Sequence, residues 1–118
     1  MKIEDKRREP RTFIKIKVDY SCKDAYLYDY SANLSEGGIF IQTTKLHRVG
    51  DKIDVTFILP ELLEKIEAKA TVAWINDKKH PKLPMGMGLK FVRLPKKKKE
   101  LIQSVIHKIE EGKRQTPI

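Results

Sequence analysis

The sequence predicts a mainly β (all-β) domain, built as an antiparallel barrel or sandwich with one C-terminal α-helix. Three observations predict this fold class. Apolar and polar residues alternate in six separate stretches, which is the period-2 pattern of half-buried strands. The connections between these stretches are short and carry no helical pattern, which favours antiparallel pairing. The helical pattern that does occur lies near the C-terminus.

The first three strands are expected in the N-terminal part of the chain. Over 12–22, ending at Cys22, isoleucine, valine and tyrosine alternate with charged or polar residues. The second strand is expected over 25–34 and carries three tyrosines on one face. It runs into a polar, glycine-rich turn at 33–38, and a third, apolar strand follows at 39–43.

Three further strands complete the predicted sheet. The stretches 53–59 and 66–74 alternate in the same way, and the first of them is stopped by a proline. The last strand is expected over 85–93. Within it, Gly86 and Gly88 indicate a bend or a close approach of other atoms to the backbone.

A C-terminal helix is predicted from apolar residues that repeat every three or four positions between Leu101 and Ile109 and end near Gly112. Four lysines precede this stripe at 96–99. Positive charge is unfavourable at a helix N-terminus, so we expect the helix to begin near Glu100.

The chain of 118 residues is long enough for one compact core but too short for two ordinary domains. We expect a flexible N-terminal arm at 1–11, a β-barrel region at 12–94, a C-terminal helical segment at 95–112 and a tail at 113–118.

Composition indicates a soluble cytoplasmic protein with an anionic partner. Cys22 is the sole cysteine, which excludes an internal disulfide and suits a reducing compartment; we expect it to be buried in its strand. The charged N-terminus has no apolar export segment, and no later run could cross a bilayer. Lys and Arg number 25 against 16 Asp and Glu, a net charge of +9.

No catalytic or metal-binding pattern is visible, so we do not expect an enzyme. His47, His80 and His107 are expected in two loops and one helix, without cysteines or paired acids at metal-ligand spacing. Ser35 lacks the glycine-flanked turn of a hydrolase nucleophile, and no glycine-rich loop precedes Lys-Ser or Lys-Thr.

Two polar clusters lie where a barrel would not need them. In the first, Arg7, Arg8 and Arg11 precede the first strand, and the guanidinium fork can bind two phosphate oxygens or the O6 and N7 of guanine. In the second, Asn33 offers an amide that donates and accepts, close to a glycine-rich backbone. Taken separately, the first cluster is also typical of a charged tail and the second of an ordinary tight turn.

The pair of clusters resembles the signature of the PilZ domain family. An Arg-x-x-x-Arg motif at Arg7 and Arg11 is followed by Asn-x-Ser-x-x-Gly at Asn33, Ser35 and Gly38. The later strands and the closing helix are similar to the family's as well, so the resemblance covers nearly the whole chain. It implies a barrel of six antiparallel strands with the second messenger cyclic di-GMP bound on its outer surface, and no other cofactor.

The resemblance also implies roles for individual residues. Arg7 and Arg11 would bind phosphate and the Hoogsteen edge of guanine, while Asn33 would meet the Watson–Crick edge. Asn33 replaces the family's commoner aspartate. Arg8 could contact a second ligand molecule. Trp74 could stack on a guanine, although its phase with Val72 favours the alternative that it packs in the core.

Such a receptor would signal to a protein effector that the sequence does not identify, as a monomer or weak dimer, with the arm ordered by the ligand. Nucleic acid is not the expected partner. Two alternatives stay open. A small basic barrel could bind single-stranded nucleic acid through Tyr26, Tyr28 and Tyr30, and a PilZ-like adaptor could act without any nucleotide.

Overall fold

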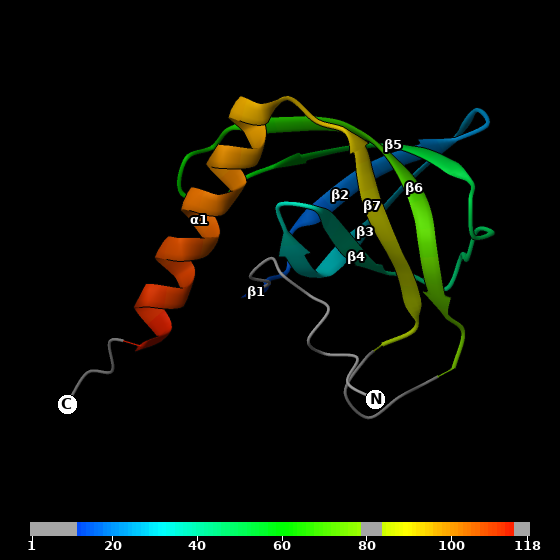
Figure 1. Ribbon diagram of the computed structural model, residues 1–118. Helices are drawn as coiled ribbons and strands as arrows, with labels where there is room; N and C mark the ends of the chain where they lie inside the picture. Colours follow the sequence, from blue (N-terminus) through cyan, green and yellow to red (C-terminus); the bar gives the residue numbers. More distant parts are fainter. Residues whose placement is uncertain (1–11, 79–83, 115–118) are drawn as a thin grey trace, which may run out of the picture.

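The computed structural model describes residues 12–78 and 84–114 of the chain. Strands make up most of the described residues, and one long helix follows them (Figure 1). The elements are β1 (Thr12–Phe13), β2 (Lys17–Cys22), β3 (Ala25–Ser35), β4 (Gly38–Gln42), β5 (Lys52–Ile58), β6 (Lys65–Asn76), β7 (Gly86–Arg93) and α1 (Lys96–Arg114). The predicted arm at 1–11 lies outside the described residues.

Six of the strands form a closed antiparallel barrel. Their order is β3-β2-β5-β6-β7-β4, and pairing of β4 with β3 closes the ring. The short β1 adds to β3 beyond the end of β2. Closure leaves no long unpaired strand edge among these six. The predicted six-stranded antiparallel barrel with a C-terminal helix is confirmed.

The first predicted strand is interrupted between Phe13 and Lys17, where the side chain of Ser31 adds its own hydrogen bonds between the backbone hydrogen bonds to β3. The hydroxyl of Ser31 on β3 donates to the carbonyl of Ile14 at 2.6 Å and accepts the N–H of Ile16 at 3.0 Å. The stretch predicted as one strand over 12–22 is therefore two strands, and both pair with β3. The alternation of apolar residues along 12–22 could not reveal this break, because it involves a side chain from another strand.

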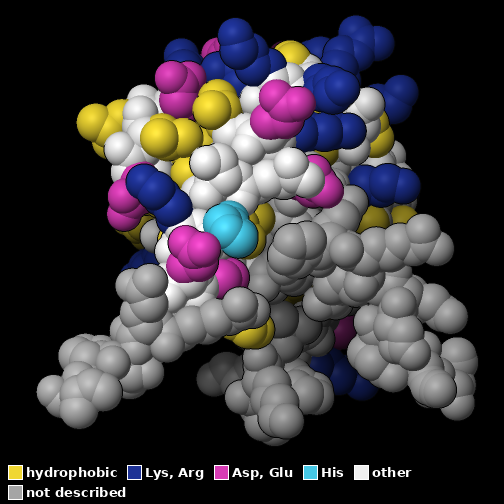
Figure 2. All heavy atoms as spheres, turned by 60° about the vertical axis from the view of Figure 1, so that its left-hand side comes forward, with side chains coloured by type: hydrophobic (Ala, Val, Ile, Leu, Met, Phe, Trp, Pro, Cys, Tyr) yellow, Lys and Arg dark blue, Asp and Glu magenta, His cyan; other side chains and the backbone are white. Residues whose placement is uncertain are grey.

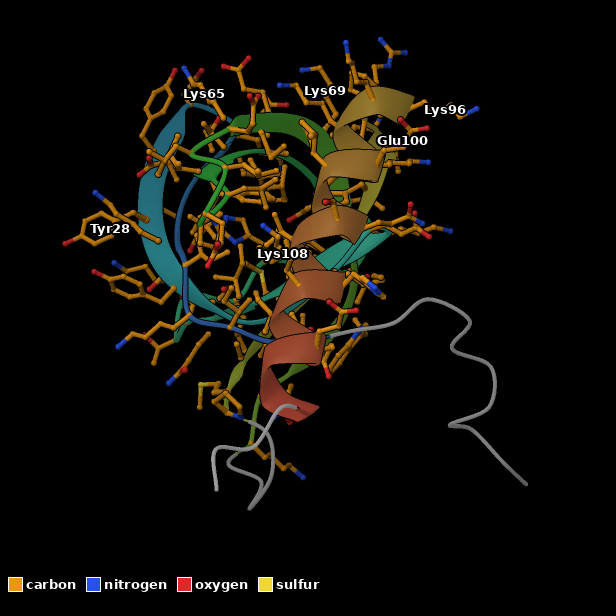
Figure 3. The ribbon with its side chains drawn as sticks, turned by 90° about the vertical axis from the view of Figure 1, so that its left-hand side faces the viewer. Tyr28, Lys65, Lys69, Lys96, Glu100 and Lys108 are labelled. Carbon is orange, nitrogen blue, oxygen red and sulfur yellow. The ribbon has the colours of Figure 1, made fainter. Side chains whose placement is uncertain are left out.

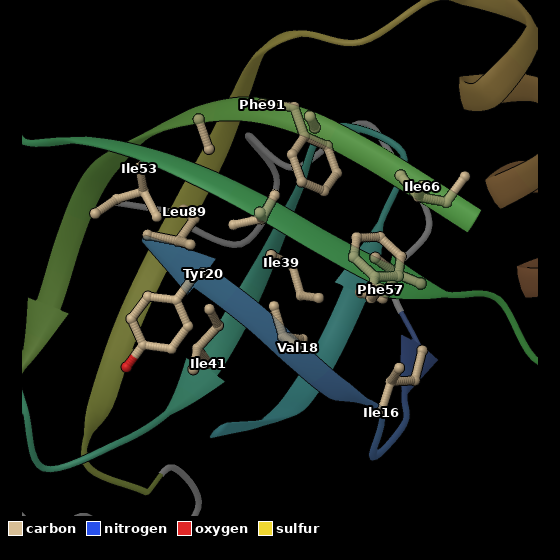
Figure 4. Packing of buried hydrophobic residues seen from close by; sticks show 14 of the residues in the cluster. Ile16, Val18, Tyr20, Ile39, Ile41, Ile53, Phe57, Ile66, Leu89 and Phe91 are labelled. Carbon is tan, nitrogen blue, oxygen red and sulfur yellow. The ribbon is translucent and has the colours of Figure 1, made fainter. Parts of the chain in front are cut away.

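Inward-facing side chains from all six barrel strands pack into one core (Figure 4). Cys22 is 6% exposed on β2, as expected from its place in the strand. Ile102, Val105 and Ile106 of α1 are buried in the same core, so the helix covers one end of the barrel (Figures 1 and 3). The apolar stripe predicted for this helix is thus the surface that it packs on the barrel.

The helix begins at Lys96, one turn earlier than the charge pattern predicts. The carbonyl of Pro95 accepts the N–H groups of Lys98 at 2.9 Å and Lys99 at 3.1 Å, which starts the helical hydrogen bonding. The ammonium of Lys98 donates to the carboxylate of Glu64 at 3.3 Å and to the carbonyl of Lys65 at 3.2 Å. These contacts offset the unfavourable interaction of lysine with the helix dipole.

Candidate functional site

The site residues expected from the sequence divide into two groups. Arg7, Arg8 and Arg11 lie outside the described residues. The other four, Asn33, Ser35, Gly38 and Trp74, lie on strands β3, β4 and β6 of the barrel. The geometry of the candidate site is therefore built from these strands and from what surrounds them.

One row of paired residues crosses the outside of the barrel and contains both Asn33 and Trp74. In order across the sheet it consists of Phe13 on β1, Asn33 on β3, Phe40 on β4, Gly88 on β7 and Trp74 on β6. The row faces outward because the chain neighbours Leu34, Ile39 and Leu89 point into the core. Strand pairing thus aligns residues that are far apart in the sequence.

Trp74 does not lie in the core, and the core prediction for it is wrong. The ladder between β6 and β7 shifts between Val72 and Trp74, so the extra residue of a bulge turns Trp74 to the outer face. Its side chain is 44% exposed. The indole packs against the ring of Phe40, with centroids 5.1 Å apart and planes tilted by 34°. The result is an exposed indole packed on the buried ring of Phe40, which is the strand neighbour of Asn33.

Two glycines make room for this aromatic surface. A Cβ placed on Gly88 would overlap the indole of Trp74, approaching Nε1 and lying 2.6 Å from Cε2. A Cβ on Gly86 would lie 2.7 Å from the ring of Phe40. Both residues share the outer face of β7, since strand side chains alternate. The close approach indicated by these glycines is thus that of Phe40 and Trp74.

The polar turn is held by its own side chains. Ser35 is fully buried; its hydroxyl accepts the N–H of Gly37 at 3.2 Å and donates to the carbonyl of Gly38 at 3.4 Å. A Cβ on Gly38 would overlap the carbonyl of Leu89 on β7. The N–H of Phe91 donates to the carbonyl of Gly37 at 2.9 Å. Ser35 and Gly38 therefore shape the turn and bring it against β7.

A pocket of about 330 Å³ opens between this turn and Trp74. Its walls include the backbone of Gly37 and Gly38, the rings of Phe40 and Trp74, and the side chains of Lys90 and Lys99. The volume is at the lower end of the range typical of small-molecule sites. Asn33 lies in the adjoining row, paired with Phe40 and 7% exposed.

Sequence reasoning missed Phe40, Lys90 and Lys99 as parts of this surface. The alternate glycines on β7 were a usable signal for an aromatic neighbour, because two missing side chains on one face leave space for a ring. Nothing in the local sequence pointed to Lys99, which comes from the helix.

Within residues 12–78 and 84–114, no cluster of three or more His, Cys, Asp or Glu side chains could hold a metal ion. His107 pairs with Glu111 along the helix at 3.1 Å, and His80 lies outside these ranges. No helix in the described part of the chain is long and apolar enough to span a membrane.

The comparisons with known proteins agree with the fold. A family model described as the PilZ domain matches residues 5–108. Among solved structures, the inhibitor of motility MotI/DgrA from Bacillus subtilis is similar, with a TM-score of 0.80 and 22% identity over 92% of this chain. The match covers 53% of that protein, so this chain spans about half its length.

Two isolated PilZ domains are similar along almost their whole length. The PilZ domain with c-di-GMP of YcgR from Escherichia coli has a TM-score of 0.70 and 16% identity, covering 92% of this chain and 94% of its own. The PilZ domain of CeSA from a cellulose synthesizing bacterium has a TM-score of 0.53 and 11% identity, covering 90% and 99%. No curated protein sequence matches significantly. At such identities the structures share the fold, and the family model carries the assignment: the chain belongs to the PilZ domain family.

Proposed function

We propose that this protein is a receptor for cyclic di-GMP that binds the ligand on the outside of the barrel, between its N-terminal arginines and the row from Asn33 to Trp74. The observation that carries the proposal is this row, which aligns an amide with an exposed aromatic surface next to the polar turn. Family membership supports it, and so does the similar PilZ domain of YcgR, whose structure contains c-di-GMP.

The residue types suit the two parts of this ligand. A guanine base can stack on the exposed face of Trp74, since aromatic side chains bind any base through its π-face. The amide of Asn33 can donate to and accept from a guanine edge. Arg7 and Arg11 would hold the phosphates in bidentate fashion, with Arg8 as an accessory contact. No step in this proposal is catalytic.

The proposed output is the ordered N-terminal arm, presented to a protein effector. Ordering a residue costs about 1 to 2 kcal/mol. A charge-assisted hydrogen bond contributes about 1.5 to 3 kcal/mol. Several arginine contacts are therefore needed together, and a site that has lost one of them should bind poorly. Like any binding to the folded state alone, the ligand should also stabilise the barrel.

Calorimetric titration with cyclic di-GMP tests the site. Arg11→Ala should weaken binding about 100-fold, and Asn33→Ala somewhat less, because each removes charge-assisted or bidentate contacts. Arg48→Ala and Gln103→Ala are matched controls, since both residues are exposed and neither lines the pocket. Unchanged affinity in both Arg11→Ala and Asn33→Ala would refute the site.

A second candidate function rests on the three tyrosines of β3. Their side chains point away from the barrel and are exposed, as Figure 3 shows for Tyr28. The ammonium of Lys17 lies 4.7 Å from the ring centroid of Tyr28, and that of Lys15 lies 5.0 Å from that of Tyr30. Alternating aromatic rings with lysines are typical of surfaces that bind single-stranded nucleic acid.

Two carboxylates count against nucleic acid at this surface. Asp19 and Asp54 line the same shallow hollow as Tyr26 and Tyr28, where phosphates would be repelled. A nucleic-acid function predicts binding that rises with oligonucleotide length and falls steeply with salt. A cyclic di-GMP site that is saturable and unaffected by competing oligonucleotide would exclude it as the main function.

A further inference from the structure

We propose that Lys90 and Lys99 supply a second set of cationic contacts at the ligand site, in addition to the N-terminal arginines, and that Lys99 makes helix α1 part of that site. The inference rests on the proposed cyclic di-GMP site and goes beyond the two sequence motifs. It assigns phosphate contacts to one strand residue and one helix residue that neither motif contains.

Lys90 emerges on the same face as the aromatic surface. It is two residues after Gly88 on β7, so both face outward, and it pairs with Gly38 on β4 and Thr71 on β6. It therefore emerges beside the polar turn, and it lines the same pocket as Trp74. Lys99 approaches from the end of the first turn of α1 and lines the same pocket.

Neither lysine has an anionic partner within the part of the chain that the structure describes. Two neighbouring cations differ from them in this respect. Lys98 pairs with Glu64 at 3.3 Å, and Lys69 pairs with Asp54 at 2.9 Å. Figure 2 shows Lys and Arg side chains gathered at the end of the molecule where α1 begins. Lys90 and Lys99 are thus cations that the described fold leaves unneutralised.

The pocket between them suits a phosphodiester. None of its described lining residues carries a carboxylate, so both lysines contribute positive charge there without a compensating anion. A bound anion would supply the missing negative charge and accept charge-assisted hydrogen bonds from them. The rings of Trp74 and Phe40 form another wall of the same opening. Cations and an aromatic surface together match the phosphate and base of one nucleotide.

Lys99 also connects the ligand to the helix. The next turns of α1 are anchored by Ile102, Val105 and Ile106 in the barrel core. A ligand bound by Lys99 would hold the start of α1 against β7 and the polar turn. Because only the bound state has this contact, ligand binding favours the arrangement in which the helix start is held. The stability of the first turns of α1 would then depend on whether the ligand is bound.

Titration of the full chain with cyclic di-GMP tests the contacts. Lys90→Ala and Lys99→Ala should each weaken binding about 5- to 30-fold, whereas Lys99→Arg should stay within about threefold of wild type. Lys97→Ala is the matched control, because Lys97 is exposed, has the same charge, lies two residues earlier on α1 and does not line the pocket. It should change the affinity less than twofold.

Hydrogen exchange tests the coupling to the helix. Cyclic di-GMP should slow exchange of the amides of residues 98–102 in the wild type and in Lys97→Ala, but not in Lys99→Ala. The inference is overturned if Lys97→Ala and Lys99→Ala weaken binding equally, or if neither lysine of the pocket matters while Arg11→Ala does. If wild-type protein does not bind cyclic di-GMP at all, the proposed function fails and this inference fails with it.

Discussion

At the scale of single residues, glycine makes room for the aromatic part of the candidate site, because it has no side chain. Phe40 is 1% exposed although it lies on the outside of the barrel, and the indole of Trp74 packs against its ring. Trp74 in turn can lie there only because Gly88 has no Cβ. An aromatic surface is therefore held in a fixed place outside the core, at a position where a larger residue on β7 would displace it.

We expect Gly88→Ala to displace Trp74. The new methyl group would overlap the indole, so the ring must move and expose more of its surface and that of Phe40. Stability should fall by about 1 to 3 kcal/mol. Trp74 is the sole tryptophan, so its emission should shift to longer wavelength. Cyclic di-GMP affinity should fall about tenfold if the base stacks there.

Gly112→Ala serves as the control. A Cβ on this residue of α1 meets nothing within 4 Å. Alanine should therefore raise stability by up to about 1 kcal/mol and leave the emission of Trp74 unchanged. The packing account of Gly88 would be wrong if Gly88→Ala also left the emission unchanged.

At the scale of elements, the start of α1 departs from the usual charge distribution of helices. Its first turn contains lysines and no acidic residue. Acidic side chains are favoured at this end and basic ones at the other. Figure 3 shows Lys96 and Glu100 near the helix start and Lys108 further along. Packing of the apolar stripe on the barrel outweighs this local electrostatic cost, which is why a charge-based prediction placed the start too late.

Lys97→Glu should stabilise the protein by about 0.3 to 1 kcal/mol, because it replaces an exposed cation in the first turn by an anion. Urea unfolding at low salt measures the gain, which should shrink as salt is added. Lys108→Glu changes the net charge equally but lies far from the first turn, so it should give no such gain. Equal gains from both changes would point to net charge and away from the dipole.

At the scale of the whole molecule, one polar contact inside the barrel makes stability depend on pH. Tyr20 on β2 is 2% exposed and donates to the carboxylate of Asp29 on β3 at 2.6 Å. Burial and then this hydrogen bond raise the pKa of Tyr20 from 10.0 to about 12. Below pH 10 the tyrosine is protonated in the folded and the unfolded chain. Between pH 10 and about 12 only the unfolded chain loses the proton, so stability falls.

Tyr20→Phe tests this contact. Near pH 8 the variant should be about 1 to 2 kcal/mol less stable than wild type, since Asp29 loses a hydrogen-bond donor. The difference should narrow from pH 10 to 12, because the variant has no buried phenol to titrate there. Tyr26→Phe, at a position that is 82% exposed, should match wild type throughout. A difference between wild type and Tyr20→Phe that stays constant from pH 8 to 12 would contradict the assignment.

Much of the fold followed from the sequence, because strand alternation and helical periodicity are local. The barrel strands and the burial of Cys22 could be predicted from side chains at alternate positions. The break at Ser31 could not, because it depends on a hydroxyl from another strand. The polar turn was also predicted, since serine and glycine have strong local preferences. Arg7 and Arg11 stay predictions.

For this protein, then, the sequence by itself determined the period of each element, the family motifs and the polar turn, because these depend on neighbours along the chain. The tertiary structure alone decided which residues meet. A single extra residue in β6 turned Trp74 from the core to the surface, since side-chain direction in a strand reverses at each residue. Barrel closure and helix docking then brought Lys90 and Lys99 to the same pocket, and no local pattern records that contact.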